Sequence, residues 1–173
     1  QALLYDGMDR LGIAQYLSRI GLLLDGNSGD ALADAKQLWV DDPVWQGMRA
    51  LCEASLTTQD WFELFLAQDL VIDTLVYELF YNQLDEKLSA EGGQDIAMLT
   101  EFMQQWHKDT SRWVDAVVKI AVAESEHNKT LIAQWIETWR GKVAEALAPL
   151  ADQMLGADAL TTALTVLDKR VAK

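Results

Sequence analysis

The sequence predicts an all-α fold, a single helical domain over residues 1–173. No segment alternates apolar and polar residues for long enough to predict a strand, whereas several long segments repeat apolar residues at helical spacing. The 173 residues include only 2 prolines and 10 glycines, too few for a disordered or collagen-like chain. A chain of this length can bury a real core and leaves little room for a second domain.

The first three helices are delimited by turn and cap signals. The first is expected over about 5–24, because the cluster Asp25-Gly-Asn-Ser-Gly29 is typical of a helix end. The second begins near Asp30 and gives way at Asp42-Pro43, where an Asp and a Pro suit an N-cap and a first helical position. This cap opens a third helix that ends near Ser55.

A long fourth helix follows, and three further helices are expected after it. Thr58 is the expected cap of the fourth helix, which runs past Leu84 and is closed by Glu91-Gly-Gly93. The remaining helices are expected over about 95–123, over about 126–153, and over a short segment introduced by Gly156 and Asp158. Pro149 is expected to bend the last turns of the sixth helix.

The fourth helix is apolar around most of its circumference, which predicts that it is covered nearly all round. Its apolar residues are Trp61, Phe62, Phe65, Leu66, Leu70, Val71, Ile72, Leu75, Val76, Leu79 and Phe80. Narrower stripes on the next two helices are typical of bundle packing. They comprise Leu99, Phe102, Met103, Trp106, Trp113, Val117 and Ile120, and then Leu131, Ile132, Trp135, Ile136, Trp139, Val143 and Leu147.

The seven tryptophans allow two interpretations. They can fill the core, or several can face a partner chain, since Trp suits a large apolar surface that also holds a hydrogen bond. The residues are Trp39, Trp45, Trp61, Trp106, Trp113, Trp135 and Trp139.

Four acids in the apolar fourth helix are the most unusual charges in the chain: Glu63, Asp69, Asp73 and Glu78. Asp69 and Asp73 lie one turn apart on one face, so they can form a functional carboxylate pair. Pairing with a cation, such as an arginine at an interface, is the favoured interpretation, because a lone buried carboxylate is costly.

Composition excludes several functions. With 27 acids and 14 bases the formal net charge is -13, and a field of that sign repels nucleic acid and anionic lipid surfaces. No apolar run reaches the roughly 18 residues of a membrane span and no signal peptide is evident, so a cytoplasmic location is expected. Cys52 is the only cysteine, which excludes a disulfide framework and a cysteine-based zinc site.

Glu124-x-x-His127 has the spacing that carboxylate-bridged di-iron proteins use twice, together with a Glu from each of two further helices. The only other histidine, His107, is preceded at that spacing by Gln104, and a neutral amide cannot supply the charge that two iron ions require. The two histidines are also about 25–30 Å apart on any helical reading. We therefore expect no catalytic, cofactor-binding or metal-binding residue in this chain. Glu124 and Glu126 then simply favour a helix N-terminus.

Three stretches carry a resemblance to a known family. These are the run Asp60-Trp-Phe-Glu-Leu-Phe-Leu-Ala-Gln-Asp-Leu-Val-Ile-Asp-Thr-Leu-Val-Tyr-Glu-Leu-Phe-Tyr81, the segment Asp9–Tyr16 and the segment Asn128–Trp139. They resemble the beta subunit of bacterial multicomponent di-iron monooxygenase hydroxylases. Phenol hydroxylase is the nearest likeness, toluene monooxygenase the next, and soluble methane monooxygenase a more distant one. Such subunits are about twice as long, so the chain is similar to the C-terminal half of one.

The resemblance implies a ferritin-like helical bundle without metal, as a structural subunit in the hydroxylation of phenol or related aromatic compounds with dioxygen. It also implies an alpha subunit that holds a di-iron centre, a gamma subunit, and a dimer of such heterotrimers. An NADH-dependent reductase and a small regulatory protein complete the implied system. No metal-ligand motif of the family carries over to a position in this chain.

Two hypotheses of different class remain at this point. One is the non-catalytic hydroxylase subunit, which predicts surplus apolar helix surface. The other is a self-contained ferritin-like metal enzyme that uses Glu124 and His127 with acids such as Asp69 and Asp73, which predicts bound iron.

Overall fold

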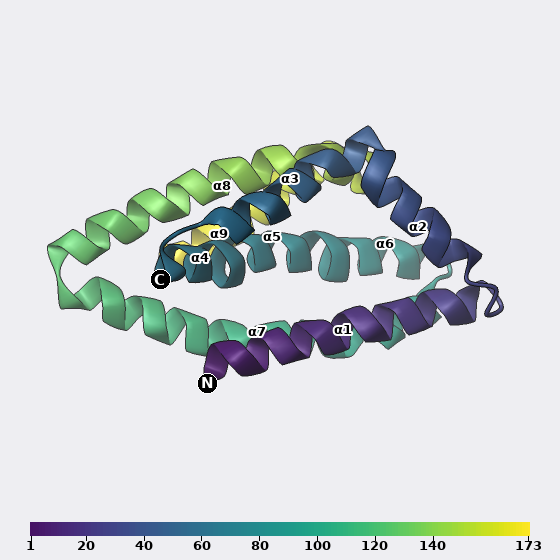
Figure 1. The fold of residues 1–173 in the computed structure, drawn as a ribbon, viewed down its shortest axis with the longest axis horizontal. Helices are drawn as coiled ribbons and strands as arrows, with labels where there is room; N and C mark the ends of the chain where they lie inside the picture. The colour runs from purple at the N-terminus through teal and green to yellow at the C-terminus, as the bar shows by residue number, and fades with distance from the viewer. The chain divides into compact units, whose positions relative to one another are not determined.

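The computed structural model describes residues 1–173, and nearly the whole chain is helical, so the all-α prediction is confirmed (Figure 1). The N-terminal helices are α1 (Ala2–Leu24), α2 (Asp30–Asp41) and α3 (Pro43–Thr57). One continuous rod follows, made of α4 (Trp61–Phe65), η1 (Leu66–Ile72), α5 (Asp73–Tyr77), η2 (Glu78–Gln83) and α6 (Leu84–Ala90). The last helices are α7 (Gln94–Glu124), α8 (Glu126–Leu155) and α9 (Ala159–Val171).

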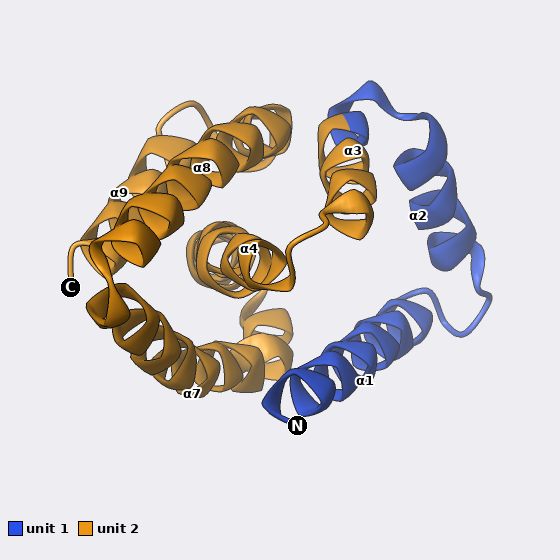
Figure 2. Cartoon of the chain, turned by 60° about the vertical axis from the view of Figure 1, so that its left-hand side comes forward, with its two compact units in different colours: residues 1–46 blue, residues 47–173 orange.

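The chain divides into two compact units, Gln1–Gln46 and Gly47–Lys173, coloured separately in Figure 2. In the first unit, α1 and α2 contact each other, and the carboxylate of Asp25 in the intervening turn accepts the backbone N–H groups of Gly29 and Ala31 at 3.0 and 3.1 Å. The turn therefore also caps α2, because it satisfies N–H groups that a helix start leaves free.

The predicted cap at Asp42 is confirmed. Its Oδ1 accepts the backbone N–H of Val44 at 2.9 Å, and Pro43 is the first residue of α3. The side-chain amide of Gln46 donates to the carbonyl of Asp42 at 3.0 Å and to that of Trp39 at 3.2 Å. Local hydrogen bonds alone thus fix where α2 ends and α3 begins.

The rod of residues 61–90 begins later than expected, and its cap is Asp60 rather than Thr58. The Asp60 carboxylate accepts the N–H groups of Phe62 and Glu63 at 2.8 and 3.3 Å. Thr58 instead donates its hydroxyl to the carbonyl of Ala54 at 3.2 Å, at the end of the preceding helix.

Two π-helical segments, η1 and η2, interrupt the α-helical hydrogen bonding of the rod. A π-turn holds an extra residue, which widens the helix locally and costs stability unless packing compensates. In η1 burial supplies this compensation, since six of its seven residues are buried, whereas in η2 only Leu79 is buried. The helical spacing of apolar residues in the rod does not predict these segments.

The other helices of the second unit pack around this rod. Figures 1 and 2 show α7 and α8 as an antiparallel pair joined by a short turn, with the rod between them and α9 alongside α8. Contacts join η1 to α8, α5 to α9, and α6 to α7. The core consists mainly of Leu66, Val71, Leu75 and Leu79 of the rod, Met103 and Val114 of α7, Trp139, Val143 and Leu147 of α8, and Ala163 and Leu167 of α9.

The approach of α3 to α8 depends on Gly47. A Cβ added there would lie 2.9 Å from the carbonyl oxygen of Ala146 and 3.0 Å from its Cα. Glycine is thus required by backbone contact. None of the helices is both long enough and apolar enough to cross a membrane.

Candidate functional site

Asp69 and Asp73 both lie inside the second unit, with 3% of each residue exposed. Asp69 belongs to η1, and Asp73 is the first residue of α5. The Oδ1 of Asp73 accepts a hydrogen bond from the side-chain amide of Gln68 at 3.1 Å, and both acids make further interactions. The partners offset a desolvation cost of several kcal/mol, so these acids are satisfied members of the packed rod.

Arg170 of α9 joins three helical elements to one another. Its side chain is only 9% exposed, and its Nε donates to Oδ1 of Asp115 in α7 at 2.8 Å. Its Nη1 donates to the hydroxyl of Thr74 in α5 at 2.7 Å and to the backbone carbonyl of Asp69 in η1 at 3.3 Å. Arg170 therefore binds the backbone carbonyl of Asp69, and its charge is paired with the carboxylate of Asp115 in α7.

Sequence reasoning did not single out Arg170. A basic residue in the last turn of a helix is expected from the helix dipole alone, so the position carried no special signal. Its partners lie 55 to 101 residues away along the chain, a separation that local patterns do not register.

The other two acids singled out in the rod also have polar partners. Glu63 accepts the indole N–H of Trp139 at 2.9 Å, which fixes this nearly fully buried tryptophan of α8. Glu78 accepts the side-chain amides of Asn82 at 2.7 Å and Gln83 at 3.2 Å.

Asp85 is a further buried acid, one that the sequence pattern does not indicate. It is 6% exposed and accepts the hydroxyl of Thr100 in α7 at 2.8 Å. Burial raises the pKa of the nearby Tyr81 phenol, and the negative charge of Asp85 adds to that rise. The sequence around Asp85 is more polar than the middle of the rod, so nothing local predicted its burial.

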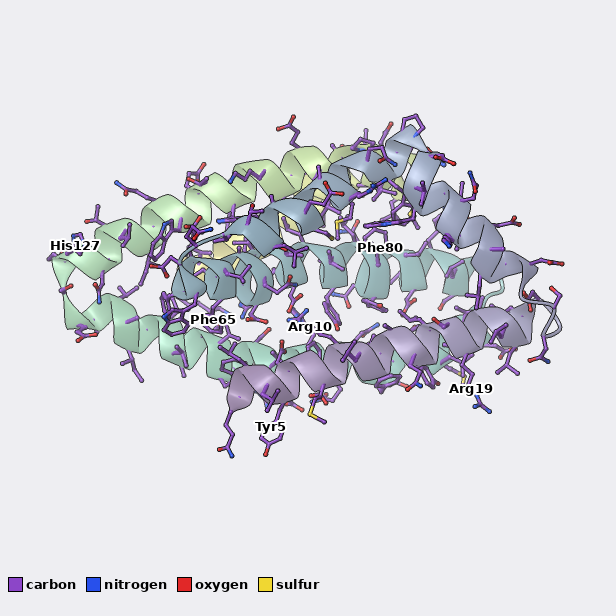
Figure 3. The ribbon with its side chains drawn as sticks, viewed as in Figure 1. Tyr5, Arg10, Arg19, Phe65, Phe80 and His127 are labelled. Atoms are coloured by element: carbon purple, nitrogen blue, oxygen red, sulfur yellow. The ribbon has the colours of Figure 1, made fainter.

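Glu124 and His127 flank the turn between α7 and α8, and both are exposed. Figure 3 shows His127 at the outer end of this turn. Ser125 caps α8 by accepting the backbone N–H of Asn128 at 3.1 Å, so the stretch is a helix start, as the residue types favour.

The second candidate half-site is occupied by other interactions. The amide of Gln104 donates to the backbone carbonyl of Tyr81, and the His107 ring stacks on Tyr77 with centroids 4.4 Å apart. No three His, Cys, Asp or Glu side chains form a group that could hold a metal ion. The structure therefore does not bring Glu124 and His127 together with Asp69 and Asp73, and these donors do not fit a carboxylate-bridged di-iron centre.

The tryptophans divide between the two interpretations. Trp139 is 1% exposed and fills the interior, and the half-buried Trp113 stacks on buried Phe65 with centroids 5.6 Å apart. Trp61 is 68% exposed at the start of the rod. Core filling is thus right for some of them and wrong for Trp61.

Large apolar side chains are exposed on two long helices. On α7 they are Met98, Leu99, Phe102, Val117 and Ile120, and on α1 they are Leu3, Leu4, Tyr5, Met8, Leu11, Leu17, Leu23 and Leu24. Scattered exposed apolar residues are ordinary, but sets this dense are typical of surfaces that bind another chain. These two helices are the best candidate interaction surfaces.

Comparison with known families and proteins gives a consistent result. A family model described as methane/phenol/alkene hydroxylase matches residues 1–125. The chain is 49% identical over 170 residues to a phenol 2-monooxygenase oxygenase component of Pseudomonas sp. (strain CF600), covering 98% of this chain and 51% of that protein. It is 51% identical over 173 residues to the corresponding component of Acinetobacter pittii (strain PHEA-2), covering 100% of this chain and 52% of that protein.

A more distant relative is the hydroxylase component subunit beta of the toluene-4-monooxygenase system of Ectopseudomonas mendocina. It is 33% identical over 125 residues, which cover 72% of this chain and 38% of that protein. The crystal structure of xenon-pressurized phenol hydroxylase from Pseudomonas sp. OX1 superposes with a TM-score of 0.93 at 46% identity, over 97% of this chain and 51% of that chain. The expected ferritin-like bundle is confirmed by this match. The chain spans about half the length of the curated phenol 2-monooxygenase relatives.

Proposed function

Because the chain belongs to the methane/phenol/alkene hydroxylase family, we propose that it forms part of the non-catalytic structural subunit of a multicomponent monooxygenase hydroxylase. The complex hydroxylates phenol or a related aromatic compound with dioxygen. The observation that carries the proposal is the identity of 49% and 51%, over nearly the whole chain, to oxygenase components of two phenol 2-monooxygenases. The proposal includes residues 1–173 as one helical domain, the C-terminal part of a longer subunit.

The proposed partners are an alpha subunit that holds the di-iron centre, a gamma subunit and a second copy of that heterotrimer. The reductase and the regulatory protein act through the complex, in the cytoplasm. Support for bound partners comes from the exposed apolar side chains of α7 and α1, whose burial would stabilise an assembly by roughly 25 cal/mol per Å² of apolar surface. Support for beta-type membership comes from the toluene-4-monooxygenase relative, which is a hydroxylase subunit beta.

In this proposal the chain performs no chemical step itself, and none of its residues is catalytic, cofactor-binding or metal-binding. Its residues maintain a rigid bundle: Arg170 joins α9 to α7 and α5, and Glu63 fixes Trp139 between the rod and α8. A rigid scaffold helps to hold a partner's site in the geometry that its reaction requires.

The test replaces both Glu124 and His127 with Gln in the full-length subunit, co-expressed with the other hydroxylase subunits. Iron per assembled complex and the rate of phenol hydroxylation are then measured. We expect unchanged iron, with activity reduced only as far as assembly is reduced. The matched control is Glu126→Gln with Lys129→Gln, which removes a surface pair of the same helix turn at 3.7 Å and no candidate ligand.

Loss of iron in proportion to the substituted chain, in an intact complex and in the test variant alone, would refute the structural role. It would favour the metal-enzyme alternative. If the full-length subunit purified without any of the other hydroxylase subunits, that result would separately refute the proposed complex.

A further inference from the structure

One pocket of the second unit departs from the acidic character of this chain; it is bordered by α5, η2, α7 and α9 and has a volume of about 490 Å³. Five of the 14 bases of the chain line it: Lys108, Arg112, Lys169, Arg170 and Lys173. Only two of the 27 acids do so, Glu78 and Asp115. The ratio of acids to bases in the pocket is thus the reverse of that in the whole chain.

Internal ion pairs do not neutralise this cluster. Arg170 is paired with Asp115, and Arg112 with Asp109 on the surface of α7. Lys108, Lys169 and Lys173 have no carboxylate within ion-pair distance among the ion pairs of the chain.

The acid Glu78 is occupied by neutral donors, since its two oxygens accept the amides of Asn82 and Gln83. Glu78 keeps its negative charge, but the five bases still outnumber Glu78, Asp115 and Asp109 by two, so an excess of positive charge remains in the pocket.

The helix dipole explains only part of the cluster. The C-terminal end of a helix favours cations, which accounts for basic residues at the end of α9. Lys108 and Arg112 lie in the middle of α7, where the dipole has no such effect. Holding these cations beside those of α9 raises the energy of the folded chain, unless a counter-charge is present.

We propose that this pocket binds a small free oxyanion, of the phosphate or pyrophosphate class. Lys108 of α7 and Lys169 of α9 both line it, and the Arg170 side chain, which also lines it, is held in place by its bonds to Thr74 and Asp115. A concave site concentrates the local positive field.

Size and charge together favour a small ligand. The formal net charge of -13 repels an extended polyanion or a large acidic domain, whose charges would lie mostly over the acidic surface. At physiological ionic strength charges are screened beyond about 8 Å. An ion within the pocket lies closer than this to the pocket cations, whereas most of the acidic residues of the chain are screened from it.

The test is calorimetric titration of sodium pyrophosphate into the purified assembly with its full-length subunit, at constant ionic strength in sodium chloride. The variants are Lys108→Gln and Lys169→Gln, and the matched control is Lys119→Gln, another exposed lysine of α7 that does not line this pocket. We expect saturable binding at one site. Each pocket substitution should raise Kd about two- to five-fold, the double variant by roughly the product, and the control not at all.

Three results would overturn the proposal. The first is no saturable binding of pyrophosphate by the unsubstituted protein, and the second is equal binding by all variants. The third is that the pocket substitutions, but not Lys119→Gln, release another subunit without changing pyrophosphate binding, because the pocket would then hold a partner's carboxylate.

Discussion

Replacing Arg170 with methionine should destabilise the fold strongly, because it removes the cation that joins α9 to α7 and to the rod. Methionine retains much of the aliphatic length, so little volume is lost. The carboxylate of Asp115 would lose its partner, and the hydroxyl of Thr74 would lose a donor.

The expected magnitude follows from burial. Breaking a fully buried ion pair by removing one partner costs roughly 3–5 kcal/mol. The Arg170 side chain is 9% exposed, but that of Asp115 is 30% exposed, so water can solvate part of the orphaned carboxylate. We therefore expect a loss of about 2–4 kcal/mol in the free energy of unfolding.

The assay is equilibrium urea unfolding, followed in parallel by circular dichroism and by tryptophan fluorescence, because coincident curves are needed for a two-state treatment. A double-mutant cycle with Asp115→Asn isolates the pair, with an expected coupling of about 1–2 kcal/mol. Arg140→Met is the control, since its pair with Asp168 lies on the surface and should be worth less than about 1 kcal/mol. A change below about 0.5 kcal/mol for Arg170→Met, or no coupling in the cycle, would refute the reasoning.

Three further outcomes are expected. Gly47→Ala should lower the free energy of unfolding by about 1–3 kcal/mol, because the added Cβ meets backbone atoms of α8. Gly141→Ala, where no atom lies near the added Cβ, should raise it by roughly 0.5–1 kcal/mol in the same urea assay. Cys52 is exposed, but partial burial of its thiol still raises the pKa, so its alkylation by iodoacetamide should reach half-maximal rate above the usual pH of about 8.5; a midpoint at or below that value would contradict the assignment. The hydrogen bond from Arg140 lowers the pKa of Asp168, so the pair should contribute stability above about pH 4 and lose it as pH falls through the lower folded-state pKa. This dependence is small, and Asp168→Asn should remove it from the acid side of a plot of unfolding free energy against pH.

The sequence predicted helix boundaries well where the signal is local. The cap at Asp42 and the proline after it act within a few residues, and so does Gly156, which was expected to introduce the last helix and which ends α8 with a positive φ of 95°. Thr58 and Asp60 are both cap residues two positions apart, and only the observed hydrogen bonds show that Asp60 is the one used. Such near-equivalent choices set the limit of boundary prediction.

What the sequence could not supply were the features made by tertiary contact. A charge within an apolar helix predicted buried acids with polar partners, and Asp73 does accept the amide of Gln68; the favoured pairing of Asp69 or Asp73 with a cation stays a prediction. The roles of Arg170 and Asp85 depend on residues in other helices, and local composition gave no reason to expect either. The π-helical segments likewise were not marked by the apolar spacing of the rod, which is that of an ordinary helix.

The π-helical segments also make the rod a place where chain length can change. In an α-helix one added or deleted residue rotates everything beyond it by about 100° and exchanges buried for exposed faces. A π-turn already stores one surplus residue, so a deletion within 66–72 can convert it to α-helix and leave Leu75 and Leu79 facing the core. The most buried helix of the molecule thus has two positions, η1 and η2, at which evolution can alter its length without redesigning its surroundings.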